Sequence, residues 1–217
     1  MSHGIGWEIF GKLLNIAKNK PSLGPCFGKN CKCDSSRSLK LQFPFISEYT
    51  SSEKRLIVKA LQGFHSTTCI RFVPRNNETD CISVENKYGC FSFLGKVGGS
   101  QVLSLQRSGC VSYGIIQHEF NHALGFWHEH TRSDRDNYVR INWANMNPQM
   151  AFNFNKQVTN NLNTSYDYSS IMHYGRTAFS INGLDTITPI PNPNVQIGQK
   201  QGLSSMDIIR INKLYSC

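Results

Sequence analysis

The sequence has no apolar run long enough to cross a membrane, so we expect no membrane span. It also lacks internal repeats, low-complexity tracts and the paired C-x-x-C motifs of a structural zinc site. The net charge of +9 comes from Lys and Arg residues spread along the chain, without a basic run or a nucleic-acid motif. We therefore interpret the charge as a basic surface and expect no nucleic-acid partner. A module that binds heparin or nucleic acid is the alternative.

The first 20 residues do not resemble a signal peptide, because Glu8 and Lys12 interrupt the apolar region and no small-residue cleavage site follows. Apolar residues recur there at helical spacing, which favours a short amphipathic helix. The chain changes character at residues 21–25, which contain Pro and Gly. We interpret residues 1–25 as a leader or pro-segment remnant and residues 26–217 as one folded domain. The start of the precursor is expected to be missing.

The eight cysteines are even in number and widely scattered, which indicates disulfides and an oxidising compartment. Two glycosylation sequons, at Asn77 and Asn163, agree with a secretory route, although such triplets also arise by chance. We therefore expect a secreted, extracellular protein.

The segment that begins at His118 has the pattern H-E-x-x-H-x-x-G-x-x-H, which predicts a zinc hydrolase site. Positions i and i+4 project from one helix face, so His118 and His122 can bind one metal ion from the same side. Glu119 then lies where a general base can take a proton from water, whose pKa the metal lowers toward about 7. Gly125 can end the helix in the left-handed conformation, and His128 completes the site.

Hydrophobic periodicity predicts three helices. The first, capped by Ser52, should run to about residue 64, and the helix of the histidine motif should span roughly residues 112–124. A terminal helix should begin at Ser204 or Ser205 and end at Tyr215. Its buried side should consist of Met206, Ile209 and Leu214.

Alternating apolar residues predict strands in the first half of the chain. These strands cover residues 39–43, 69–73, 81–85 and 101–105. Residues 142–203 are rich in Asn, Pro and Ser and show little periodicity, so the second half should consist mainly of loops.

A second signature lies downstream, where residues 170–175 read S-I-M-H-Y-G. Together with the histidine motif and the E-H-T-R-S-D-R-D of residues 129–136, it closely resembles the astacin family of secreted metzincin endopeptidases. The resemblance is dense over residues 26–217. Segments such as residues 69–75 and 187–194 look most like the teleost six-cysteine astacins, a group that includes hatching enzymes.

The resemblance implies an α+β, zincin-like metzincin fold of two subdomains. A twisted mixed sheet and two long helices would form the N-terminal half, which ends at Gly125, and loops with a terminal helix would form the other half. Substrate would lie in an extended cleft, paired with an edge strand near residues 92–100. Gly95, Gly98 and Gly99 in that segment would allow close backbone approach, or else form a flexible turn.

The resemblance also assigns roles to individual residues. His118, His122 and His128 match the ligands of one zinc ion, and Glu119 matches the general base and acid. Tyr174 matches the tyrosine that ligates zinc in the resting enzyme and swings away to stabilise the oxyanion.

Two further residues match functional positions of the family. Met172 matches the Met-turn residue, whose thioether forms a floor beneath the metal, and Glu129 matches the acid that receives the new N-terminus of the mature protease. The family's pro-segment inhibits through the Asp of a Phe-x-Gly-Asp motif, which residues 1–25 do not supply. Whether this chain is a zymogen therefore stays open.

Disulfide pairing likewise follows from the resemblance. It implies bonds between Cys69 and Cys217, between Cys90 and Cys110, and between the N-terminal pair Cys26 and Cys31. Two cysteines, Cys33 and Cys81, are not expected in the six-cysteine group. Their simplest fate is a fourth disulfide.

These observations lead us to expect a monomeric zinc endopeptidase that hydrolyses internal peptide bonds of extracellular proteins, with egg-envelope glycoproteins as a candidate substrate. The alternative is a catalytically inactive metzincin-like module that binds glycoproteins without cutting them. Loss of Glu119 or of a ligand histidine would indicate that alternative, and all of them are present.

Overall fold

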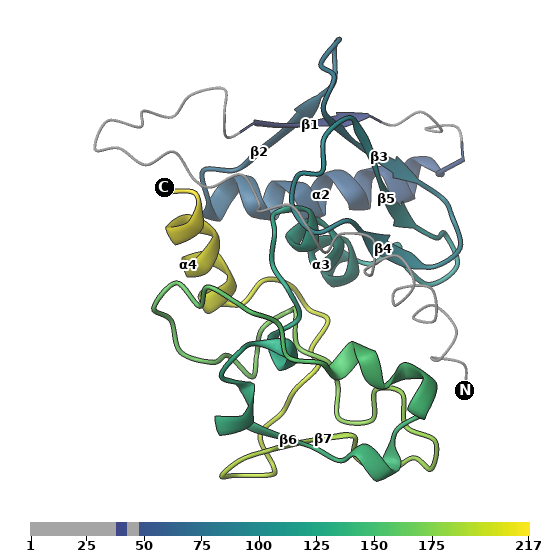
Figure 1. Ribbon diagram of the computed structural model, residues 1–217. Coiled ribbons are helices and arrows are strands. Elements are labelled where there is room, and N and C mark those ends of the chain that lie inside the picture. Colours follow the sequence, from purple (N-terminus) through teal and green to yellow (C-terminus); the bar gives the residue numbers. More distant parts are fainter. Residues whose placement is uncertain (1–37, 43–47) are drawn as a thin grey trace.

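The computed structural model describes residues 38–42, as backbone, and residues 48–217 (Figure 1). A five-stranded sheet has the order β2-β1-β3-β5-β4. Its strands are β1 (Ser38–Gln42), β2 (Arg71–Pro74), β3 (Cys81–Glu85), β4 (Cys90–Ser92) and β5 (Ser100–Leu105). β1 pairs in parallel with β2 and β3, and β3 with β5, whereas β4 runs antiparallel to β5 at the edge. The predicted mixed sheet is confirmed.

The first described helix, α2 (Ser51–Thr67), begins before its predicted cap. Thr50 is the N-cap: its hydroxyl accepts a hydrogen bond from the Glu53 N–H, and the Glu53 carboxylate accepts one from the Thr50 N–H. The prediction that Ser52 caps this helix is therefore wrong, because the reciprocal capping box satisfies two backbone donors at Thr50. The buried face consists of Ile57, Ala60, Leu61 and Phe64, at helical spacing.

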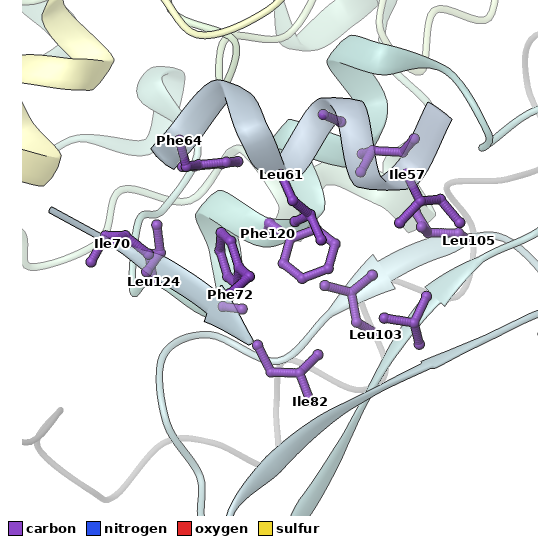
Figure 2. Close-up of a cluster of buried hydrophobic side chains, with 14 of the residues drawn as sticks. Ile57, Leu61, Phe64, Ile70, Phe72, Ile82, Leu103, Leu105, Phe120 and Leu124 are labelled. Carbon is purple, nitrogen blue, oxygen red and sulfur yellow. The ribbon is translucent and has the colours of Figure 1, made fainter. Parts of the chain in front are cut away.

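The catalytic-motif helix, α3 (Tyr113–Ala123), agrees with the predicted span, and Ser112 is its N-cap. Side chains from α2, α3 and the sheet meet in one hydrophobic core (Figure 2). Its centre is a set of edge-to-face aromatic contacts, in which the Phe72 ring lies 5.4 Å from Phe64 and 4.9 Å from Phe120. This core fixes α3, and therefore the histidine motif, relative to the sheet.

The loop-rich second half that the sequence predicts is also confirmed. Its regular elements are short: β6 (Val139–Ile141) pairs antiparallel with β7 (Ile187–Pro189). Four 3-10 segments accompany them, at Glu129–Thr131, Arg135–Asn137, Trp143–Asn145 and Pro148–Phe154. This half has its own hydrophobic cluster, formed by Val139, Ile141, Met146, Phe154, Tyr166, Tyr174 and Ile187. One cluster lies mainly in each half, with Ile211 of the terminal helix joining the first, which is the arrangement expected of two subdomains.

The terminal helix, α4 (Ser205–Leu214), begins where the sequence predicts, but its predicted buried side is wrong. Ile209 is 43% exposed, and Met206 and Leu214 are only partly buried. The buried residues are instead Asp207, Arg210 and Ile211. Two charged side chains can occupy this buried face because each has polar partners in distant segments of the chain.

The segment between β4 and β5 is a turn, so the predicted edge strand over residues 92–100 is wrong. Its three glycines, Gly95, Gly98 and Gly99, all have positive φ, which a strand does not allow. The side chain of Gln101 holds the turn by donating to the carbonyl of Gly95 and accepting from the N–H of Val97. The sheet edge is formed by β4, which ends at Ser92.

Two of the expected disulfides are present, Cys69–Cys217 and Cys90–Cys110. The former links the start of β2 to the chain end after α4. The leader at residues 1–25, the Cys26–Cys31 pair and Cys33 lie outside the described residues, so the predictions for them stay open. In the described part of the chain, no helix combines the length and apolar character that crossing a membrane requires.

Candidate active site

The end of α3 arranges the motif's backbone. α3 gives way at Leu124 to Gly125, whose φ of +98° is the left-handed conformation expected of a helix-ending glycine. The carbonyl of His122 accepts hydrogen bonds from the N–H of Gly125 at 2.8 Å and from that of Gly95 at 2.9 Å. The chain can then reverse, and His128 lies at the N-cap of the 3-10 segment Glu129–Thr131.

The three imidazoles converge on one point. The Nε2 atom of His128 lies 3.2 Å from Nε2 of His118 and 3.2 Å from Nε2 of His122. The Nδ1 atoms of His118 and His122 face the carbonyls of Ile171 and Phe126, at 2.9 and 2.8 Å. Carbonyls only accept, so both Nδ1 atoms carry protons and both Nε2 atoms present lone pairs. His128 Nε2 faces both of these lone pairs, and three imidazole nitrogens directed at one point are a donor set that fits a zinc ion.

Burial keeps these imidazoles neutral. It holds the pKa values of His118 and His128 well below the ordinary histidine value, and it lowers the pKa of His122 to about 4. The neutral form is the one that binds a metal.

Glu119 is fully buried beside the histidines, and neither of its carboxylate oxygens has a hydrogen-bond partner among the described residues. Burial raises the pKa of this carboxyl to about 8, and the positive charge of Lys200 opposes the shift. Ionised Glu119 in turn adds to the effect of burial in raising the pKa of Tyr174. A buried carboxyl that is not fixed by an ion pair or hydrogen bond is available for proton transfer.

The turn that contains Met172 is held from two sides. The Met172 N–H donates to the Ser170 hydroxyl, and the Met172 carbonyl accepts from the Glu129 N–H at 3.0 Å. On the other side, Asp207 of α4 accepts from the Ser170 hydroxyl at 2.6 Å and from the Ile171 N–H at 2.9 Å. Because the Ile171 carbonyl is the partner of His118, Asp207 supports the orientation of that imidazole. Met172 itself is buried, and its role as a floor beneath the metal stays a prediction.

Tyr174 lies next to the imidazole cluster and is 3% exposed. Its ring centroid is 4.5 Å from that of His128 and 4.0 Å from that of His130. Phe154 and Phe179 complete the surroundings, each at 5.8 Å. The structure thus brings Tyr174 to the three histidines and Glu119, as the motifs predict.

Sequence reasoning missed three buried residues near the site: His130, Asp207 and Arg210. Asp207 had a detectable signal, because Ser204 and Asp207 have the spacing of a capping box, and both reciprocal hydrogen bonds are present. His130 lies in the segment of residues 129–136 that carries the family resemblance, but nothing there indicated a role for it. Arg210 gave no signal, since its partners lie far away in the sequence.

Comparison with known proteins agrees with this geometry. The model of the astacin peptidase family matches residues 32–216. High choriolytic enzyme 1 of Oryzias latipes is 59% identical over 205 residues, which are 93% of this chain and 76% of that protein. Low choriolytic enzyme of the same fish is 52% identical over 196 residues, 88% of this chain and 72% of that protein.

A solved structure resembles the whole domain. It is that of high choriolytic enzyme 1, described as a hatching enzyme zinc-protease from Oryzias latipes. The TM-score is 0.82 at 57% identity, and the match covers 91% of this chain and 100% of that chain. Myroilysin shares the fold at 19% identity, with a TM-score of 0.56.

Proposed function

Because the chain belongs to the astacin family of zinc metalloendopeptidases, we propose that it is secreted and cleaves egg-envelope glycoproteins at internal peptide bonds. The observation that carries the chemical part is the convergence of three neutral imidazoles beside the buried carboxyl of Glu119. The proposed substrate class is supported by the similarity to choriolytic enzymes. Secretion is supported by the disulfides, which persist in oxidising compartments.

In this proposal His118, His122 and His128 hold one zinc ion, and Tyr174 is its ligand in the resting enzyme. Zinc held there would act as a Lewis acid that polarises the scissile carbonyl, lowers the pKa of water and favours the ionised form of Glu119. The carbonyls of Ile171 and Phe126 keep the imidazoles in the metal-binding tautomer.

Glu119 moves the proton. Its carboxylate takes a proton from the attacking water and delivers it to the leaving amide nitrogen, so that the amine departs uncharged. The absence of fixed partners on this carboxylate within the described chain leaves both oxygens available for the two transfers.

Tyr174 stabilises the oxyanion. Burial and the charge of Glu119 raise the pKa of its phenol, which favours the protonated form once the oxygen is away from the metal. A protonated phenol that leaves the metal can donate a hydrogen bond to the oxygen on which negative charge develops.

The substrate is an extended peptide, and β4 is the element proposed to receive it by strand addition. The strand is the edge of the sheet and pairs with β5 on one side. Its neighbour in sequence, the glycine turn, is bound to the carbonyl of His122 through the Gly95 N–H. A peptide paired with β4 is thereby placed in register with the end of α3.

The enzyme is proposed to act as a monomer.

Digestion of isolated fish egg envelopes tests the substrate class. Purified zinc-loaded enzyme and its Glu119→Gln variant would be incubated with envelopes and, in parallel, with a denatured protein. We expect mass spectrometry to identify peptides released by internal cleavage of envelope proteins with the wild type and none with the variant. If the denatured protein is cleaved while the envelope proteins stay intact, the endopeptidase activity is supported and the egg envelope is refuted as the substrate.

A further inference from the structure

His130 is a fully buried imidazole two residues after the third histidine, and the reaction described above does not use it. Its Nε2 atom lies 3.0 Å from the carbonyl oxygen of Asn153. Because a carbonyl only accepts, Nε2 carries the proton, and this bond fixes both the tautomer and the plane of the ring.

The other ring nitrogen of His130 is an anomaly. Nδ1 is buried and has no hydrogen-bond partner among the described residues. Leaving a buried polar atom unsatisfied is destabilising, and a phenylalanine at this position would avoid that penalty. A phenylalanine, however, has no N–H with which to fix the plane of its ring. The unsatisfied atom is therefore explained if the fixed plane is what matters.

That plane faces Tyr174. The two rings are stacked, with centroids 4.0 Å apart and planes 29° apart. The other rings around Tyr174 in the described chain are more inclined to it, at 49° for Phe179, 54° for His128 and 79° for Phe154. Of these four rings, that of His130 is therefore the most nearly parallel to the phenol ring.

The backbone of Tyr174 is held independently. His173 Nδ1 donates to the Tyr174 carbonyl at 2.7 Å, and its Nε2 accepts from the hydroxyl of Tyr166, also at 2.7 Å. Gly198 approaches so closely that a Cβ added there would lie 2.4 Å from the Cα of Gly175. Displacement of the phenol must therefore come from the side chain. A stacked ring can move parallel to its neighbour without breaking a directional hydrogen bond.

We propose that His130 is a positioning residue for Tyr174, whose ring it holds in the plane from which the phenol oxygen reaches the metal and along which that oxygen withdraws. The inference rests on the proposed role of Tyr174 and deepens it. His130 itself touches neither substrate nor metal.

The test uses Cu²⁺ in place of zinc, because a tyrosine oxygen bound to Cu²⁺ gives a charge-transfer absorption band in the visible range. Tyr174→Phe supplies the blank. His130→Leu removes the flat face, His130→Phe keeps a face without the bond to Asn153, and Phe179→Leu is the matched control for a more inclined ring. Metal content and far-UV circular dichroism establish that each variant is folded and loaded.

The wild type and Phe179→Leu are expected to show the band at equal intensity, and His130→Leu to lose or shift it. With zinc, kcat of His130→Leu should fall about 10- to 100-fold while KM changes less than about 2-fold. His130→Phe, which lacks the bond to Asn153, should also weaken or shift the band, because its ring plane is no longer fixed. If His130→Leu does not fold, a wild-type band in folded His130→Phe overturns the inference.

Two other results would overturn it. If His130→Leu keeps the wild-type band and the wild-type kcat, His130 is a packing residue. If Phe179→Leu loses the band as much as His130→Leu does, the effect does not depend on the stacked ring of His130. If the wild type shows no band beyond that of Tyr174→Phe, Tyr174 is not a metal ligand. That result refutes both the assignment of Tyr174 as a metal ligand and the inference about His130. A band that persists in His130→Leu would instead refute the inference alone.

Discussion

Arg210 of α4 donates to both carboxylate oxygens of Glu129, at 2.6 and 2.9 Å, directly after the third histidine of the motif. The two side chains are 8% and 4% exposed, so the pair is desolvated. Glu129 also accepts from the Asp167 N–H, and Arg210 also donates to the Ser165 carbonyl at 2.7 Å. This network ties the terminal helix to the segment that carries His128. Any docking of a mature N-terminus at Glu129 would have to accommodate it.

Arg210→Met is expected to lower the free energy of unfolding by about 3–5 kcal/mol, because it removes the nearest cation from the buried Glu129 carboxylate and leaves only Arg132, at 3.7 Å. The control is Lys96→Met, which breaks an exposed pair with Asp80. The control should lose far less stability, because solvent screens an exposed pair. Urea denaturation of both zinc-loaded variants measures the difference. Equal losses would show that burial does not govern the Arg210 pair.

Tyr174→Phe removes the phenol oxygen and keeps the stacked ring. If that oxygen stabilises the transition state more than the ground state, kcat should fall roughly 10²-fold or more while KM changes little. Steady-state kinetics on a peptide substrate measures both constants. An unchanged kcat would reduce Tyr174 to a packing residue.

Thr50→Ala should destabilise the protein by about 0.5–2 kcal/mol, since Thr50 caps α2, whereas Ser52→Ala should change stability by less than about 0.5 kcal/mol. Urea denaturation of the two variants measures both changes. A larger effect of Ser52→Ala would instead support Ser52 as the N-cap, as the sequence suggests.

The Glu53 carboxylate, which takes part in the capping box of α2, makes the stability of the protein depend on pH. Hydrogen bonds from the Thr50 N–H and from Arg107 lower the pKa of Glu53 below its unfolded value of about 4.3. Its contribution to stability is therefore present above that pH and is lost as pH falls through the folded pKa. The stability difference between wild type and Glu53→Gln should thus shrink below about pH 4.

Cys33 and Cys81 are predicted to form a disulfide. Cys81 is buried in β3, and Cys33 lies outside the described residues. The bond would close a loop of about 49 residues, for which chain entropy predicts a stabilisation on the order of 4 kcal/mol. Non-reducing peptide mapping should recover the linked peptides with no alkylatable thiol. A free thiol at Cys81, or Cys33 joined to Cys26, contradicts the pairing.

Local rules account for what the sequence predicts correctly. His118 and His122 are one helical turn apart, and Gly125 supplies the reversal that brings His128 back, so their convergence needs no knowledge of distant contacts. The two observed disulfides instead came from the family resemblance, since spacing alone does not select a pairing.

The errors arise where tertiary contacts override local pattern. Apolar residues on α4 predicted the wrong buried side, because Asp207 and Arg210 find partners near Ser170 and at Glu129 that no local rule connects to them. The role proposed for His130 escaped notice for the same reason, since its partners Asn153 and Tyr174 lie far from it in the sequence.

In the proposed mechanism, a zinc ion held by three histidines activates water, and Glu119 moves the proton that lets an internal peptide bond break. The direct measurement is zinc content together with mass-spectrometric mapping of the fragments of a denatured protein, before and after 1,10-phenanthroline. We expect one zinc per chain and internal cleavage that is lost on chelation and restored by zinc. Glu119→Gln should retain the zinc and lose nearly all turnover, whereas cleavage that survives chelation or this substitution would contradict this mechanism.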